Sequence, residues 1–447
     1  MTALAPEPPG GGAVAEDRLV LDDAPLNRFH LKITALTFCA NFSDGFELGI
    51  IGIALPTLTK SLGITTLWQA LLGSAALVGL FFGSTTVGWL ADKFGRQRLY
   101  LWDFAVIAVA ALLQFFVETP GQLLVLRLII GFGIGADYAL GPTLVAEFVP
   151  RRYRGMLLAS LTVMWTVGYT AAFFFGNALA PTGGEVWRYL LASSAIPAIL
   201  VVLLRIGTPE SPRWLAMRGK LDEARTVARR MTGQDIDPTS LVSADETHTT
   251  RYLDVFAPIH RRNTIFGIVF YNAQVIPYFA IFTFLPLVLS KMGLGEENYT
   301  VDSVLNLFLL LGGIAGIWFV AKWSRRAVTI GSFVVLIIAL LPLTFATYLP
   351  IPILLAFFII FTFTMSGATN LDQVYPAELY PTELRGSGVG LLNGLSRIGS
   401  AIGTFLLPLA LNSVGLSWTM SGLVAVLVVG LVVSILIAPE TKGTALD

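Results

Sequence analysis

The chain has 447 residues, of which 55 % are hydrophobic and only 13 % charged, with no formal net charge. Soluble domains carry roughly a quarter charged residues, so this composition excludes an ordinary soluble domain. The balanced charge argues against a nucleic-acid partner, and the single cysteine, Cys39, excludes a disulfide framework.

The N-terminal residues 1–24 are rich in Pro, Gly and Ala and show no basic-then-apolar signal pattern, so we expect a disordered cytoplasmic tail over residues 1–30. After them, uncharged stretches of about 20 residues, the length that crosses hydrocarbon, recur along the chain. In lipid the backbone must satisfy its own hydrogen bonds, which predicts helices. We therefore predict an all-α membrane protein with about twelve transmembrane helices. The expected spans lie near 31–57, 68–91, 99–118, 121–148, 156–180, 187–206, 264–290, 300–321, 327–348, 351–375, 387–413 and 417–438.

The second half of the chain repeats the first at a shift of 230 or 231 residues. The segment AEFVPRRYRG at 146–155 aligns with AELYPTELRG at 377–386, and PES at 209–211 aligns with PET at 439–441. Many secondary transporters are built from such repeats. We expect two pseudo-symmetric six-helix bundles over 31–206 and 263–438, joined by a cytoplasmic helical linker at 207–262 and followed by a tail at 439–447.

The distribution of cations predicts the orientation of the bundles. Most of the 29 Lys and Arg fall on one side of the predicted spans, and only Lys60, Arg188 and Lys291 fall on the other. The positive-inside rule then places both termini in the cytoplasm, in a multi-pass protein of the plasma membrane.

Several loop motifs resemble those of a known transporter family. GWLADKFGRQR at 88–98 resembles the loop signature of the major facilitator superfamily, and PESPRWL at 209–215 and VYPAELYP at 374–381 resemble signatures of its sugar porter branch. The resemblance implies the major facilitator fold and transport by alternating access. It also implies that Glu–Arg pairs bridge helix ends on the cytoplasmic side and latch the two halves. The expected gating residues are Asp92, Arg96, Glu147, Arg154, Glu210, Glu378, Arg385 and Glu440.

Charged residues inside the spans are the candidates for proton coupling, because an unpaired charge at mid-bilayer costs at least about 2.5 kcal/mol. Asp44 and Glu47 in the first span share a helix face. The segment around Glu47 resembles the proton-linked acidic motif of sugar porters, and Arg127 matches the arginine that faces it. Asp137 with Tyr138 resembles a pattern of metabolite:proton symporters. The alternatives are a static ion pair and a hydrogen-bonded helix contact.

The substrate site is predicted from the fifth, seventh, tenth and eleventh spans. Only Gln274 remains of the paired glutamines of sugar porters, which disfavours a hexose. Arg397, about 18 Å beyond Arg385 along a helix, resembles the arginine that receives the solute in organic anion transporters. The alternative is a structural pair with Asp372. The expected substrate-binding residues are Trp165, Tyr169, Tyr271, Asn272, Gln274, Tyr278, Asn370 and Arg397.

These features predict proton-coupled uptake of a small organic solute, with an organic acid favoured over a sugar or polyol. Facilitated diffusion or efflux by the same fold, and a sensor that binds without transporting, are the alternatives. No nucleophile–base constellation or metal-ligand spacing indicates an enzyme, a cofactor or a metal site, and we expect a monomer.

Overall fold

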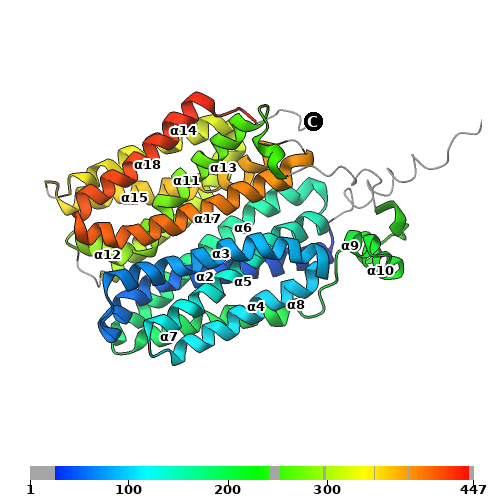
Figure 1. Cartoon of the computed structure of the whole chain (residues 1–447), viewed down its shortest axis with the longest axis horizontal. Helices are drawn as coiled ribbons and strands as arrows, with labels where there is room; N and C mark the ends of the chain where they lie inside the picture. The colour runs from blue at the N-terminus through cyan, green and yellow to red at the C-terminus, as the bar shows by residue number, and fades with distance from the viewer. Residues whose placement is uncertain (1–25, 242–251, 295–297, 347, 381, 442–447) are drawn as a thin grey trace, which may run out of the picture.

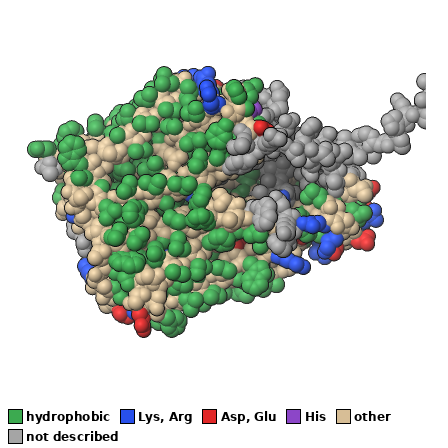
Figure 2. Space-filling view, viewed as in Figure 1, with side chains coloured by type: hydrophobic (Ala, Val, Ile, Leu, Met, Phe, Trp, Pro, Cys, Tyr) green, Lys and Arg blue, Asp and Glu red, His purple; other side chains and the backbone are tan. Residues whose placement is uncertain are grey.

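The computed structural model describes residues 26–241, 252–294, 298–346, 348–380 and 382–441. Those residues contain helices and no strand, and twelve of the helical segments are long and apolar enough to cross a membrane. The all-α fold with twelve spans, predicted from the sequence, is therefore confirmed. Hydrophobic side chains cover the visible flank, and charged side chains concentrate toward its ends (Figure 2).

The spans of the first half run from α2 to α8, and those of the second half from α11 to α18 (Figure 1). The first half comprises α2 (Arg28–Leu62), α3 (Thr66–Phe94), α4 (Arg96–Leu113), α5 (Pro120–Phe148), α6 (Arg151–Leu179), α7 (Val186–Ser193) and α8 (Ala195–Arg205). The second half comprises α11 (Arg261–Thr283), α12 (Leu285–Lys291), α13 (Tyr299–Lys322), α14 (Arg325–Thr344), α15 (Ile351–Ala368), α16 (Leu371–Glu378), α17 (Thr382–Ser413) and α18 (Gly415–Ile437).

Three of the predicted single spans are each divided into two helices. The sixth breaks at Ser194, the seventh at Phe284 and the tenth at residues 369–370. Pro286 lies in the first turn of α12, where its missing N–H leaves no helix bond unmade. A continuous apolar run predicts that a segment crosses the membrane, but it does not reveal these interruptions.

Helix packing follows the sequence repeat. In the first half α2 packs along α6, α3 along α5 and α4 along α8; in the second half α11 packs along α17, α13 along α15 and α14 along α18. The corresponding spans therefore pair in the same way in both halves. The two bundles meet where α3 packs on α17 and α6 packs on α13.

Two glycines bring α2 and α6 into direct backbone contact. A Cβ added to Gly45 would lie 2.0 Å from the carbonyl oxygen of Trp165, and one added to Gly168 would lie 1.9 Å from that of Phe42. Only glycine permits this approach. The contact holds α2, the helix that carries Asp44 and Glu47, directly against α6.

The linker forms two short helices, α9 (Pro212–Met217) and α10 (Leu221–Thr232), beyond the end of the bundles at which the C-terminus also lies (Figure 1). Glu210 accepts hydrogen bonds from the N–H groups of Arg96 (3.2 Å) and Gln97 (3.0 Å) at the start of α4. Glu440 accepts one from the N–H of Arg325 (3.1 Å) at the start of α14. A carboxylate at a helix N-terminus is stabilised by the helix dipole, and the repeat places one in each half.

Candidate functional site

Glu47 and Arg127 form a buried ion pair between α2 and α5. The Nη1 of Arg127 lies 2.9 Å from Oε1 of Glu47, and both side chains are about 1 % exposed. Oε2 of Glu47 and Nε of Arg127 have no hydrogen-bond partner among the described residues. Gln114 and Ser194 lie close enough to interact with the same carboxylate. The structure therefore contains the ion pair predicted from the sequence. Because Oε2 of Glu47 and Nε of Arg127 have no described partner, the carboxylate can form other hydrogen bonds.

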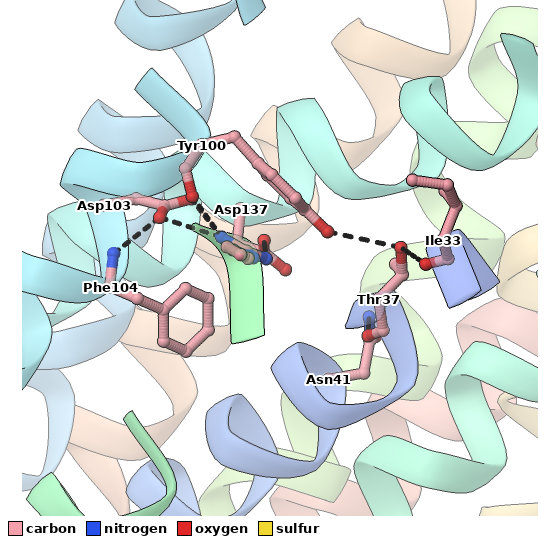
Figure 3. A network of polar contacts seen from close by, with 8 residues as sticks. Ile33, Thr37, Asn41, Tyr100, Asp103, Phe104 and Asp137 are labelled. Carbon is pink, nitrogen blue, oxygen red and sulfur yellow. Dashed lines mark hydrogen bonds and ion pairs between the residues drawn. The ribbon is translucent and has the colours of Figure 1, made fainter. Parts of the chain in front are cut away.

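A second buried cluster includes Asp44, which lies three residues before Glu47 on α2. Arg205 at the end of α8 bonds Asp103 of α4 at 2.9 Å and Asp137 of α5 at 2.5 Å, and Asp44 is within electrostatic range of all three. In Figure 3 Asp103 and Asp137 lie close together, and the hydroxyl of Tyr100 reaches across to Thr37. Asp44 and Asp137 were expected from the sequence, but Asp103 and Arg205 were not.

Arg397 of α17 is buried at the boundary between the bundles. Its guanidinium carbon lies 5.1 Å from the ring centroid of Tyr138, on α5, and 5.9 Å from that of Phe279, on α11. Asp372 is within electrostatic range, but no ion pair joins it to Arg397. The side chain of Arg397 makes no hydrogen bond or ion pair with any described residue. The structural pair considered as the alternative is therefore not formed.

Aromatic side chains from both bundles gather beside Phe279. Trp165 stacks on Tyr169 with centroids 5.3 Å apart and lies 6.2 Å from both Tyr278 and Phe279. The hydroxyl of Tyr169 donates to the carbonyl of Phe282 at 2.9 Å, which links α6 to α11. The indole N–H of Trp165 is buried, and no described residue accepts a hydrogen bond from it. Three of the expected substrate residues thus lie together, next to the phenyl ring that approaches Arg397.

The other expected substrate residues differ in whether their polar atoms are already hydrogen-bonded. Tyr271 donates to Oδ1 of Asn393 at 2.7 Å, and Asn272 donates to the carbonyl of Ile268 in its own helix. Asn370 donates to the carbonyl of Gly313 at 3.0 Å, so its amide nitrogen already joins α13 to the loop before α16. Gln274 is fully buried, and neither atom of its amide has a described partner. Gln274 is thus the one expected amide left wholly available to a solute.

The expected gating residues fall into two groups. The side chains of Asp92, Glu147, Arg154 and Arg385 lie outside the described residues. Among the others, Glu378 pairs with Arg325 at 2.9 Å and accepts a hydrogen bond from Thr441. Arg325 belongs to the same bundle as Glu378, so this pair joins helix ends within one half instead of latching the two halves. Glu210 and Glu440 cap helix N-termini, as described above.

A cavity of about 470 Å³ lies between α6 and α13, apart from Arg397. Its lining includes Phe174, Asn177, Tyr299 and Ser303, none of which the sequence singled out. Asn177 donates to Tyr299 and Ser303 there, at 3.2 and 3.0 Å, so these contacts cross between the bundles.

Two signals in the sequence could have identified the missed residues. Asp103 lies seven residues after Arg96 in an otherwise apolar span, so its charge falls inside the helix. Arg205 is the last residue of a span and looks like one of the cytoplasmic cations that set orientation. Only the packing of α4 on α8 shows that it turns inward.

Comparison with known proteins agrees with this architecture. Residues 32–447 match the family described as sugar (and other) transporter. The chain is 42 % identical to the inner membrane metabolite transport protein YgcS of Escherichia coli, over 95 % of each chain. It is 24 % identical to the niacin transporter NiaP of Acinetobacter baylyi, over 96 % of this chain and 98 % of that one. A partially occluded inward-open structure of the xylose transporter XylE from E. coli superposes with a TM-score of 0.80 at 18 % identity, covering 94 % of this chain and 100 % of that chain.

Proposed function

The chain belongs to the sugar (and other) transporter family of the major facilitator superfamily, and we propose that within it this protein couples the uptake of a small organic acid to protons. Family membership makes it a multi-pass membrane transporter and not an enzyme. The proposal covers the choice of an organic acid and the proton coupling. It also includes a monomeric protein whose two termini lie in the cytoplasm.

Arg397 is the observation that carries the choice of an acid. It is a buried cation without a carboxylate partner among the described residues, and such a charge is costly in a membrane interior unless a ligand pairs with it. A guanidinium binds a carboxylate through two parallel hydrogen bonds. Tyr138 and Phe279 contact the guanidinium through their rings, so its N–H groups are available to such a ligand.

The aromatic cluster favours a solute with an apolar or aromatic body. Trp165, Tyr169 and Tyr278 come from both bundles, and a solute between them would be released as the bundles rock about it. One relative is named as a niacin transporter, and niacin is an aromatic carboxylate. Nicotinate is therefore the first compound to test.

Proton coupling is proposed for Glu47 with Arg127, and for Asp44 with Asp137. A carboxylate beside a guanidinium pairs with it when ionised and releases it when protonated. The Glu47–Arg127 pair is fully buried and keeps unpartnered polar atoms, so protonation of Glu47 would free both side chains to move.

A sugar is the second candidate, and Gln274 is the observation that favours it. Its buried amide has no described partner and could bond a hydroxyl, and the structural neighbour is named as a xylose transporter. A neutral sugar leaves Arg397 unpaired, which is why the acid is preferred.

Uptake into proteoliposomes tests the proposal. Purified full-length protein would be given radiolabelled nicotinate, D-glucuronate, D-xylose or D-glucose, with an inward proton gradient and with or without a protonophore. We expect a carboxylate to accumulate above its outside concentration, and we expect the protonophore and Arg397→Ala to abolish that accumulation. Arg262→Ala, which removes an exposed arginine, serves as the control. Accumulation of xylose alone, undiminished by Arg397→Ala, would refute the organic-acid proposal.

A further inference from the structure

Four charged side chains from four different helices meet inside the first bundle. Asp44 lies on α2, Asp103 on α4, Asp137 on α5 and Arg205 on α8, and their exposed fractions run from 0 to 5 %. Three carboxylates thus face one guanidinium among buried side chains.

Both carboxylate oxygens of Asp103 accept hydrogen bonds from Arg205. Arg205 donates to both oxygens of Asp103, at 2.9 and 3.2 Å, and the N–H of Phe104 donates to Oδ1 of Asp103. Arg205 also donates to the carbonyl of Tyr100 and lies over its ring, 3.2 Å from the centroid. Asp103 and Arg205 are therefore a satisfied ion pair, held in place by aromatic packing.

Asp137 and Asp44 are not satisfied in this way. Asp137 receives one bond from Arg205 through Oδ1, and its Oδ2 has no donor among the described residues. Neither oxygen of Asp44 has a donor in the described part of the chain, although the side chain is 0 % exposed. The groups that act on Asp44 are Asp137, Asp103 and Arg205, and the nearby hydroxyl of Tyr100 is already bonded to Thr37.

We propose that Asp44 and Asp137 share one bound proton and, with Asp103 and Arg205, form a proton site separate from the Glu47–Arg127 pair. Two adjacent buried carboxylates do not both ionise against a single cation. A proton on one of them supplies the missing donor to the other and reduces the uncompensated charge. Among the described residues no group of carboxylate, imidazole and thiol side chains is arranged to hold a metal ion in its place.

The position of this site links it to the proposed solute site. Tyr138 follows Asp137 and interacts with both Asp44 and Arg397. An anion bound to Arg397 would add a negative charge beside Tyr138, which follows Asp137 on α5, and would favour the protonated form of the site; by linkage the proton would strengthen anion binding. This step rests on the proposed function, whereas the presence of the proton does not.

Infrared spectroscopy of the purified full-length protein in lipid tests for the proton without any solute. A protonated carboxyl has a carbonyl absorption that an ionised carboxylate lacks. We expect the wild type at neutral pH to show this absorption, and we expect Asp44→Asn to lose one component of it. Asp302→Asn is the matched control, because Asp302 is another buried acid with no described ion-pair partner, on α13, and its replacement should leave that component in place.

Two results would overturn the proposal. One is a wild-type spectrum without protonated carboxyl absorption at neutral pH, and the other is an Asp44→Asn spectrum that retains every component. If Asp44→Asn fails to fold, Asp44→Ser, which supplies a hydroxyl donor instead of an amide donor, takes its place. Because no solute is present, failure of carboxylate uptake leaves this result standing, and loss of the shared proton leaves the uptake result standing.

Discussion

The guanidinium of Arg397 lies over the ring of Tyr138, with 5.1 Å between the guanidinium carbon and the ring centroid. The contact joins α17 of the second bundle to α5 of the first, one residue from Asp137. It therefore links the side chain proposed to hold the solute to the helix that carries Asp137, across the boundary at which the bundles would move.

This contact predicts how Tyr138 affects solute affinity. A cation–π contact shielded from water contributes up to about 2 kcal/mol, or about 30-fold in Kd. We expect Tyr138→Leu to weaken binding of nicotinate by roughly that factor, measured by equilibrium binding to the purified protein. Tyr138→Phe keeps the ring and should bind nearly as tightly as the wild type. Equal losses in both variants would mean that the hydroxyl, and not the ring, is what matters.

Glu47 should control coupling and leave solute exchange intact. Glu47→Gln resembles the protonated acid and cannot cycle between charge states, so we expect uphill uptake to disappear. Counterflow exchange of the same solute should continue, because exchange requires no net proton movement. Both activities would be measured in proteoliposomes with the carboxylate found in the uptake screen. Survival of uphill uptake in Glu47→Gln would show that the coupling proton binds elsewhere.

The sequence predicted the parts of the fold that depend on local composition. Long apolar runs identified the twelve spans, and the repeat identified Glu210 and Glu440 as equivalent positions, although their contacts with helix N-termini were seen only in the structure. It did not predict the break at Phe284, because a broken span and a continuous one have the same apolar composition.

The sequence predicted the site contacts that a motif indicates, and it missed the contacts that depend on helix packing. Glu47 and Arg127 were paired through the resemblance, and the structure brings them to 2.9 Å. Glu378 was expected to latch the halves, but its partner is Arg325, which lies 53 residues earlier in the same bundle. Partners so far apart in sequence depend on how helices pack, which a single sequence does not state.

The contact between α2 and α6 predicts a strict requirement at Gly45. A methyl group there would lie 2.0 Å from a backbone oxygen that has little freedom to move, and overpacking of this kind costs about 1–3 kcal/mol. We expect Gly45→Ala to lower the thermal unfolding temperature in detergent. Gly422→Ala is the control, because no atom lies within 4 Å of a Cβ added at Gly422. Equal stability of the two variants would mean that the helices can separate without cost.

Arg205 should be the most sensitive charged residue of the first bundle. Arg205→Met leaves Asp103 without its ion-pair partner and Asp137 with no described donor, both of them buried. Removing one partner of a buried pair costs about 3–5 kcal/mol, which would be measured by denaturant unfolding in detergent. Arg225→Met is the control, because its pair with Asp235 at 3.5 Å is more than half exposed and contributes at most about 1 kcal/mol. Adding Asp103→Asn to Arg205→Met should restore part of the stability, because it removes the carboxylate that depends most on Arg205. Equal stability of Arg205→Met and Arg225→Met would show that the buried carboxylates do not need the guanidinium.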